Sequence, residues 1–155
     1  MDLKNKSVKP ALIRISKRLS DIIDALPLKE EIRVLEIGCG PGAAAREISK
    51  RIGNGKILAI DRSANAIQNA IRNSISYDSS RLEFRQAEIE NFQLQPNEKP
   101  FDLALAIRVG ALDGRHPELE GAALASIAKA LTKNGKLYID GGNPLQEKSL
   151  EKYRT

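Results

Sequence analysis

The apolar residues of this chain recur with two different periods. From Leu12 to Leu26 they lie three or four residues apart, which predicts an amphipathic helix over residues 11–26 that Pro27 ends. Short continuous apolar runs, typical of buried strands, follow at residues 32–37, 56–60, 81–87, 101–107 and 136–140. The segments between these runs predict helices over residues 43–52, 63–74 and 117–131, and a loop with at most a short helix over residues 88–100.

Strands that alternate with helices in this way indicate an α/β fold. We expect a doubly wound, mainly parallel sheet of about five strands with helices on both faces. After the fifth strand, residues 141–144 predict a turn and residues 145–153 a short polar helix. The fifth strand would then be an exposed edge, which the terminal segment could cover or through which a homo-oligomer could pair.

Composition and charge limit the function classes. A chain of 155 residues with one Cys, and with no apolar run long enough to span a membrane, predicts one cytoplasmic domain without a disulfide framework or a metal site, and no membrane partner. Residues 1–20 carry the whole net charge of +5. A basic arm of this kind, residues 4–18, could contact nucleic acid, or it could be a solvated leader with no partner.

The strongest chemical signal is a glycine-rich turn after the first strand. Residues 34–42 read Val-Leu-Glu-Ile-Gly-Cys-Gly-Pro-Gly, so a buried strand runs directly into Gly38 and Gly40. Glycines let the backbone turn tightly and approach a ligand closely. The second strand ends at Asp61, an acid placed to accept hydrogen bonds from ribose hydroxyls. Together these features predict an adenosine-type ligand at the carboxyl edge of the sheet.

Two classes of adenosine ligand fit this turn. Gly38, Gly40 and Ala43 satisfy the dinucleotide fingerprint Gly-x-Gly-x-x-Gly/Ala, which would indicate an oxidoreductase. Glu36 disfavours that interpretation, because its carboxylate would lie close to the pyrophosphate and repel it. A cationic or zwitterionic ligand removes this conflict.

The segment Glu36–Gly42, Glu-Ile-Gly-Cys-Gly-Pro-Gly, resembles E-x-G-x-G-x-G, the first signature of class I S-adenosylmethionine-dependent methyltransferases. Asp61 matches the ribose-binding acid of that family. Further segments resemble its adenine-contact, fourth-strand and fifth-strand signatures in the same order, at residues 86–88, 101–106 and 131–137. The resemblance covers residues 32–140. It implies a Rossmann-like sheet of order 3-2-1-4-5 that lacks the family's usual last two strands.

The resemblance also implies a domain division and a set of cofactor contacts. Residues 1–27 would form the basic arm and amphipathic helix, and residues 28–155 the domain that binds S-adenosylmethionine. Backbone groups at the glycine turn would cradle the methionine part, Glu36 would hold its amino group, and the backbone N–H of Ala87 would reach adenine. The expected cofactor-binding residues are Glu36, Gly38, Cys39, Gly40, Asp61, Arg62, Gln86, Ala87, Glu88 and Arg108.

Glu36 could instead be a surface acid on a strand edge, Asp61 a plain helix cap, and Glu88 an ordinary polar residue of a loop.

Three other expected residues also leave alternatives open. Gln86 stands where the family usually has Asp, and its amide oxygen can accept a hydrogen bond only without charge assistance. Arg108 could bind the carboxylate of the cofactor or of the acceptor, or pair with Asp102 or Glu36. Cys39 could be a nucleophile, but a small buried thiol in a tight turn explains it better.

The loop after the fourth strand, residues 107–117, leaves the same edge and would face the methyl acceptor. It contains His116, the single histidine, which could serve as a general base or merely pack beside Pro117. The sequence therefore predicts a methyltransferase that uses S-adenosylmethionine on a small-molecule acceptor. The alternatives are a cofactor-binding module without turnover, as a subunit of a complex, and an RNA methyltransferase guided by the basic arm.

Overall fold

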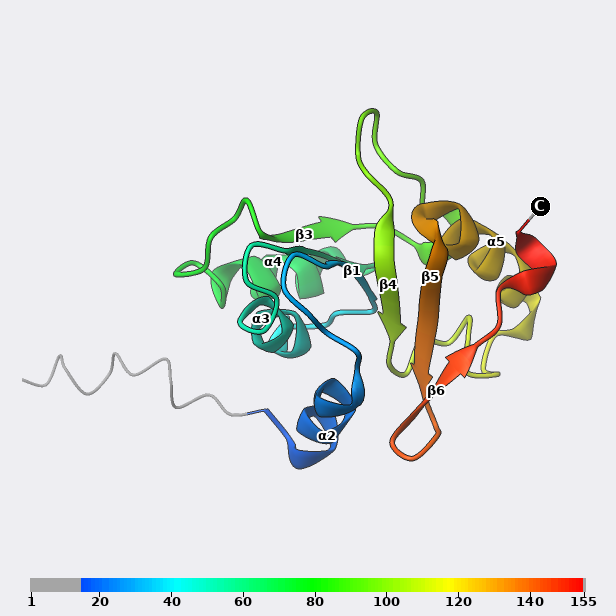
Figure 1. Cartoon of the computed structure of the whole chain (residues 1–155), viewed down its shortest axis with the longest axis horizontal. Coiled ribbons are helices and arrows are strands. Elements are labelled where there is room, and N and C mark those ends of the chain that lie inside the picture. Colours follow the sequence, from blue (N-terminus) through cyan, green and yellow to red (C-terminus); the bar gives the residue numbers. More distant parts are fainter. Residues whose placement is uncertain (1–14, 155) are drawn as a thin grey trace, which may run out of the picture.

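The computed structural model describes residues 15–154, which form a single six-stranded sheet between two layers of helices (Figure 1). The sheet order is β3-β2-β1-β4-β5-β6, with the first five strands parallel and β6 antiparallel to β5. The strands are β1 (Arg33–Ile37), β2 (Lys56–Asp61), β3 (Leu82–Gln86), β4 (Phe101–Ala106), β5 (Leu131–Asp140) and β6 (Leu145–Lys148). The doubly wound, mainly parallel sheet is therefore confirmed.

The helices divide between the two faces of the sheet. The α-helices are α2 (Lys17–Ala25), α3 (Ala43–Ser49), α4 (Ala64–Arg72) and α5 (Glu120–Ala130), and the 3₁₀ turns are η2 (Ile89–Asn91), η3 (Pro117–Leu119) and η4 (Glu151–Tyr153). Helices α2, α3 and α4 share one apolar cluster with the sheet, while α5 and η2 contribute to the cluster on the other face. None of the helices in residues 15–154 is long and apolar enough to cross a bilayer.

The strands contribute side chains to both clusters, because successive side chains of a strand point to opposite faces of the sheet. In β1, Val34 belongs to the cluster of α2, α3 and α4, whereas Leu35 and Ile37 belong to that of α5. The strands are apolar almost throughout, as expected for a sheet covered on both faces. This double coverage fixes the register that aligns the carboxyl ends of β1, β2 and β4.

The first helix follows the predicted apolar stripe over the part of the chain that the structure describes. Helix α2 begins after Ser16, whose hydroxyl accepts a hydrogen bond from the N–H of Leu19. Ile22 and Ile23 are buried against the sheet layer. Residues 1–14, which contain most of the predicted basic arm, lie outside the described residues.

The prediction for the chain after α5 was wrong in two ways. Residues 145–153 form β6 and the 3₁₀ turn η4, and not a polar helix. The fifth strand also starts at Leu131 and not at Lys136, because the chain bulges between the Phe101–Leu131 and Leu103–Lys136 pairs of β4 and β5. Local polarity predicted the helix, but the unpaired backbone of β5 offers hydrogen bonds that a strand satisfies.

The pairing of β6 with β5 also removes the basis for one predicted interface. Tyr138 faces Glu147 and Asp140 faces Leu145 across this antiparallel pair. The terminal segment therefore covers residues 137–140 of the fifth strand, which is one of the two expected alternatives, and the prediction of a homo-oligomer loses the support of a free edge there. The free edges of the sheet are β3 and β6.

Two glycines allow a test of the packing that aligns β1 and β2. A Cβ at Gly55 would lie 2.3 Å from the carbonyl oxygen of Ile32. That oxygen belongs to the backbone and accepts the N–H of Lys56, so Gly55→Ala forces β2 away from β1. We expect Gly55→Ala to lower the free energy of unfolding by more than about 2 kcal/mol.

The matched control is Gly121→Ala. Gly121 lies exposed in α5, where a Cβ would meet only the Tyr153 hydroxyl at 3.9 Å. This variant should be neutral or more stable by up to about 1 kcal/mol, because Ala restricts the unfolded chain and favours helix. Urea unfolding measures both variants, and equal stability of the two would contradict the close approach at Gly55.

Candidate functional site

A cavity of about 290 Å³ lies at the carboxyl ends of β1, β2 and β4. This is the edge of a parallel sheet where ligands bind in doubly wound folds, and the volume is close to the roughly 300 Å³ at which small-molecule pockets begin. Its walls come from the glycine turn, the ends of β2 and β3, and the loop after β4. The lining residues are Ile37, Gly38, Ile60, Asp61, Arg62, Ala87, Glu88, Ile89, Glu90, Arg108, Val109, Gly110, Ala111, Arg115 and His116.

The structure brings most of the predicted site residues to this cavity. Those that line it are Gly38, Asp61, Arg62, Ala87, Glu88, Arg108 and His116. The other predicted residues, which do not line it, are Glu36, Cys39, Gly40 and Gln86. The first group comes from four separate segments of the chain, so only the sheet register places them together.

The glycine turn is shaped by its contacts with β2 and the loop after β4. Gly38 has a φ of +75°, and a Cβ there would lie 2.9 Å from the Cγ2 of Val109. The N–H groups of Gly38 and Cys39 both donate to the carbonyl oxygen of Ile60. Gly38 is therefore required both for its left-handed backbone and for the close approach of the loop after β4.

Asp61 connects the turn to the end of β2. One carboxylate oxygen accepts the N–H of Gly40 at 2.9 Å, and the other accepts the N–H of Ser63 at 2.9 Å. A carboxylate has about four lone-pair sites, so two acceptor sites remain for a ligand after these bonds. The backbone holds this carboxylate in place at the cavity wall.

The segment after β3 differs from the expectation for adenine contacts. The N–H of Ala87 donates to the carbonyl oxygen of Asp61, so it is already used inside the protein. The side chain of Gln86 donates to the carbonyl oxygen of Arg62 and does not line the cavity. The acid that faces the cavity is Glu88, which accepts hydrogen bonds from Arg62 and from Asn91.

Glu90 also lines the cavity, although it is not among the site residues predicted from the sequence. Its side chain is 11% exposed, and its Oε1 has no hydrogen-bond partner among residues 15–154. The Arg62 guanidinium lies 3.8 Å from its other oxygen. The available signal was a second acid shortly after the third strand, but the 3₁₀ turn η2 that contains it was not predicted as part of the site.

Glu36 lies beneath the turn rather than in the cavity wall. It is 4% exposed, and its Oε1 has no hydrogen-bond partner within the described part of the chain. Burial, and then the negative charge of Asp61, raise the pKa of Glu36 to about 8, while Arg46 lowers it. A buried acceptor of this kind is a place where a ligand ammonium or N–H group can be satisfied.

Cys39 is a buried free thiol. Burial, with the charges of Glu36 and Asp61, raises its pKa far above the usual range for a thiol. A thiolate is therefore disfavoured, and the interpretation of Cys39 as a nucleophile is not supported.

The loop after β4 carries positive groups to the opposite wall. Arg108 has a φ of +57°, and its N–H donates to Asp140. Arg115 donates to the carbonyl oxygen of Arg108 and forms an ion pair with Asp113. No ion pair of Arg108 with Asp102 or Glu36 is present, since the Asp102 carboxylate accepts the N–H of Arg33 instead.

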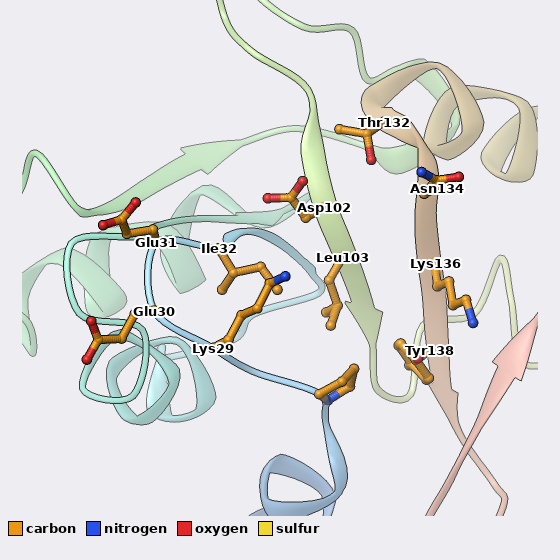
Figure 2. Close-up of a pocket in the computed structure, with 11 residues that line it drawn as sticks. Lys29, Glu30, Glu31, Ile32, Asp102, Leu103, Thr132, Asn134, Lys136 and Tyr138 are labelled. Atoms are coloured by element: carbon orange, nitrogen blue, oxygen red, sulfur yellow. The ribbon is translucent and has the colours of Figure 1, made fainter.

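Figure 2 shows a larger cavity, of about 600 Å³, beside the connector from α2 to β1. Its labelled lining residues come from that connector, from the first half of β4, and from alternate positions of β5 between Thr132 and Tyr138. It contains none of the predicted site residues, and it lies away from the glycine turn. Among residues 15–154, no group of three or more His, Cys, Asp or Glu could hold a metal ion.

The burial of Glu36 predicts a dependence of stability on pH. Its pKa is raised from 4.5 to about 8 in the folded chain, so the folded protein keeps a proton that the unfolded chain loses. The contribution of Glu36 to the free energy of unfolding is therefore highest below about pH 4.5, and it falls as the pH rises to about 8. In the unmodified protein this fall in the free energy of unfolding should be on the order of a few kcal/mol, and we expect Glu36→Gln to remove it. Urea unfolding across that pH range measures the change.

The control for this experiment is Glu151→Gln, which changes an exposed carboxylate. It should leave the pH dependence as it is in the unmodified protein. If Glu36→Gln leaves the slope of the free energy of unfolding against pH unchanged, the Glu36 carboxylate is solvated or paired in solution.

Comparisons with known proteins place this architecture among methyltransferases. The chain is 30% identical over 132 residues to a trans-aconitate 2-methyltransferase of Paracidovorax citrulli, a match that covers 83% of this chain and 46% of the relative. It is 32% identical over 75 residues to a ribosomal RNA small subunit methyltransferase H of Mycoplasmopsis synoviae, covering 48% of this chain and 25% of that protein. The chain thus spans between a quarter and about half of these curated relatives.

The fold is also found in solved structures. A Haemonchus contortus phosphoethanolamine N-methyltransferase, solved with S-adenosyl-L-methionine, superposes with a TM-score of 0.65 at 23% identity over 79% of this chain and 27% of that one. The model of a family described as a methyltransferase domain matches residues 28–154. On this match, and on the Rossmann-like sheet that carries the glycine turn, the chain belongs to the methyltransferase-domain family.

Proposed function

We propose that this chain binds S-adenosylmethionine in the cavity at the carboxyl edge and transfers its methyl group to a small molecule. The observation that carries the proposal is Asp61, whose carboxylate is fixed by the N–H of Gly40 in the turn and still has free lone pairs toward the cavity. Membership of the methyltransferase-domain family supports the same activity.

The residues of the cavity fit the cofactor. Asp61 would accept the ribose hydroxyls, and Glu88 and Glu90 offer acceptors for the exocyclic amine of adenine. The unpartnered oxygen of Glu36 beneath the turn offers an acceptor for the cofactor's amino group, directly or through water. When bound, the cofactor supplies an electrophilic methyl group on a sulfonium.

The protein's part in the transfer is mainly placement. The turn and Asp61 fix one reactant, and the loop at residues 108–116 brings the other from the opposite wall. Alignment of two bound reactants can supply most of the acceleration, with effective molarities of roughly 10⁵–10⁸ M. His116 lines the cavity, and in this proposal it would take the proton that a hydroxyl, thiol or carboxyl acceptor loses.

A small-molecule acceptor is supported by the trans-aconitate methyltransferases among the relatives. Labelled methyl transfer to metabolite fractions distinguishes an enzyme from a binding module that holds the cofactor without turnover.

Removal of the Asp61 charge should weaken cofactor binding. We expect Asp61→Asn to reduce the affinity for S-adenosylmethionine and S-adenosylhomocysteine by at least about tenfold, because the variant loses charge-assisted hydrogen bonds. Isothermal titration calorimetry measures this change. Binding of NAD in preference to both compounds would overturn the proposal and favour an oxidoreductase.

The chain contains a matched control for this variant. Asp78 accepts the N–H of Ser80, as Asp61 accepts that of Ser63, but it lies outside the cavity. Asp78→Asn therefore removes the charge from the same kind of turn contact and should leave the cofactor affinity unchanged.

An RNA acceptor is the second candidate, because residues 1–20 carry a net charge of +5 and one relative is a ribosomal RNA methyltransferase. Deletion of residues 1–9 removes three of the arm's lysines. If RNA is the acceptor, this deletion should weaken RNA binding and flatten its salt dependence in a filter-binding assay. Binding that the deletion leaves unchanged would rule out the arm as the guide.

A further inference from the structure

The charged groups that line the cavity come in two sets from different segments, one mainly acidic and one basic. Asp61, Glu88 and Glu90, with Arg62 paired to the two glutamates, form an acidic wall at the ends of β2 and β3. The opposite wall, from the loop after β4, carries three basic residues and no acidic one: Arg108, Arg115 and His116. We call this second set the cationic wall.

Arg108 is the cation of this wall that has no internal anionic partner. Within residues 15–154, its guanidinium forms no ion pair and no hydrogen bond, whereas Arg115 is paired to Asp113. The backbone of Arg108 adopts a left-handed conformation that a non-glycine residue rarely takes. Such conformations persist where surrounding contacts enforce them, and they concentrate at functional sites.

The contacts that enforce this conformation come from both sides of the residue. The Asp140 carboxylate at the end of β5 accepts the N–H of Arg108 at 3.1 Å, and Arg115 donates to its carbonyl oxygen at 2.6 Å. Asp113 in turn holds Arg115 through both carboxylate oxygens. Asp140, Asp113 and Arg115 are therefore positioning residues for a guanidinium that is left free.

The same loop brings His116 against the wall. A Cβ on Gly110 would lie 2.5 Å from the imidazole Cδ2, so the ring packs where only a glycine fits. The N–H of His116 donates to the carbonyl oxygen of Gly110, which closes the loop. The loop is thus built to present Arg108 and His116 to one cavity.

We propose that the cationic wall binds an anionic group, a carboxylate or a phosphate, of the methyl acceptor, with Arg108 as the specificity-determining contact. This inference rests on the proposed function, since it identifies the acceptor's chemical class at the same site. A guanidinium recognises carboxylate and phosphate through paired N–H groups, which an uncharged acceptor cannot match.

Charge balance favours the acceptor over the cofactor as the partner of this wall. The amino-acid end of S-adenosylmethionine carries an ammonium beside its carboxylate, and its sulfonium adds a further positive charge. The guanidinium groups of the cationic wall would gain little electrostatic stabilisation from such a ligand. An anionic acceptor neutralises both the wall and the sulfonium, and it is drawn into line with the methyl group.

The test uses citrate and inorganic phosphate as probes, titrated into the full chain by calorimetry at constant chloride, with and without saturating S-adenosylhomocysteine. We expect at least one anion to bind, and Arg108→Gln to weaken its binding by at least about tenfold. A preference for citrate indicates a carboxylate acceptor, and a preference for phosphate indicates a phosphorylated one. Arg108→Lys keeps the positive charge but loses the paired N–H groups of the guanidinium, so it should retain part of the affinity.

Arg72→Gln is the matched control, because Arg72 is an exposed arginine on α4 that bonds only Asn69 and lies outside the cavity. Anion binding that falls equally in Arg72→Gln and Arg108→Gln, or that is absent with and without the nucleoside, would overturn the proposal. A tenfold loss of S-adenosylhomocysteine affinity in Arg108→Gln would also overturn it, by assigning the wall to the cofactor. Failure of the proposed function would give a different result. In that case S-adenosylhomocysteine does not bind, while the affinity for the anion still depends on Arg108.

Discussion

The hydrogen bond from the Gly40 N–H to the Asp61 carboxylate is the contact on which the candidate site depends. It joins the turn after β1 to the end of β2, two points that lie 21 residues apart in the chain. The parallel register of β1 and β2 brings them together, and the double N–H contact of Gly38 and Cys39 with Ile60 reinforces the junction. A carboxylate that the backbone already orients loses little freedom when it binds a ligand.

The site divides its charges between segments that leave the same sheet edge. Acidic groups come from the ends of β2 and β3, and basic groups come from the loop after β4. Beneath them, Glu36 is buried with an unsatisfied oxygen, which costs stability that the apolar strands on either side supply. Buried polar groups without partners are rare in folded proteins, and here the group lies directly under a turn that is shaped for a ligand.

The end of the sheet shows how tertiary pairing decides structure that local sequence leaves open. Leu145–Lys148 is short and polar, so its composition favoured a helix. In the folded chain, β5 presents a free row of N–H and C=O groups, and the turn at residues 141–144 returns the chain beside it. The hydrogen bonds of the β5–β6 pair outweigh a weak local preference.

The sequence by itself determined the α/β class, the order of elements up to β5, the glycine turn and Asp61, because apolar periodicity and glycine spacing are local signals. Only the tertiary structure decided that Glu90 joins the predicted Glu88 at the cavity while Gln86 does not line it, that the N–H of Ala87 is already used, and that Arg108 is held with a free guanidinium. Those outcomes depend on register and on contacts between distant segments, and no single stretch of sequence encodes them.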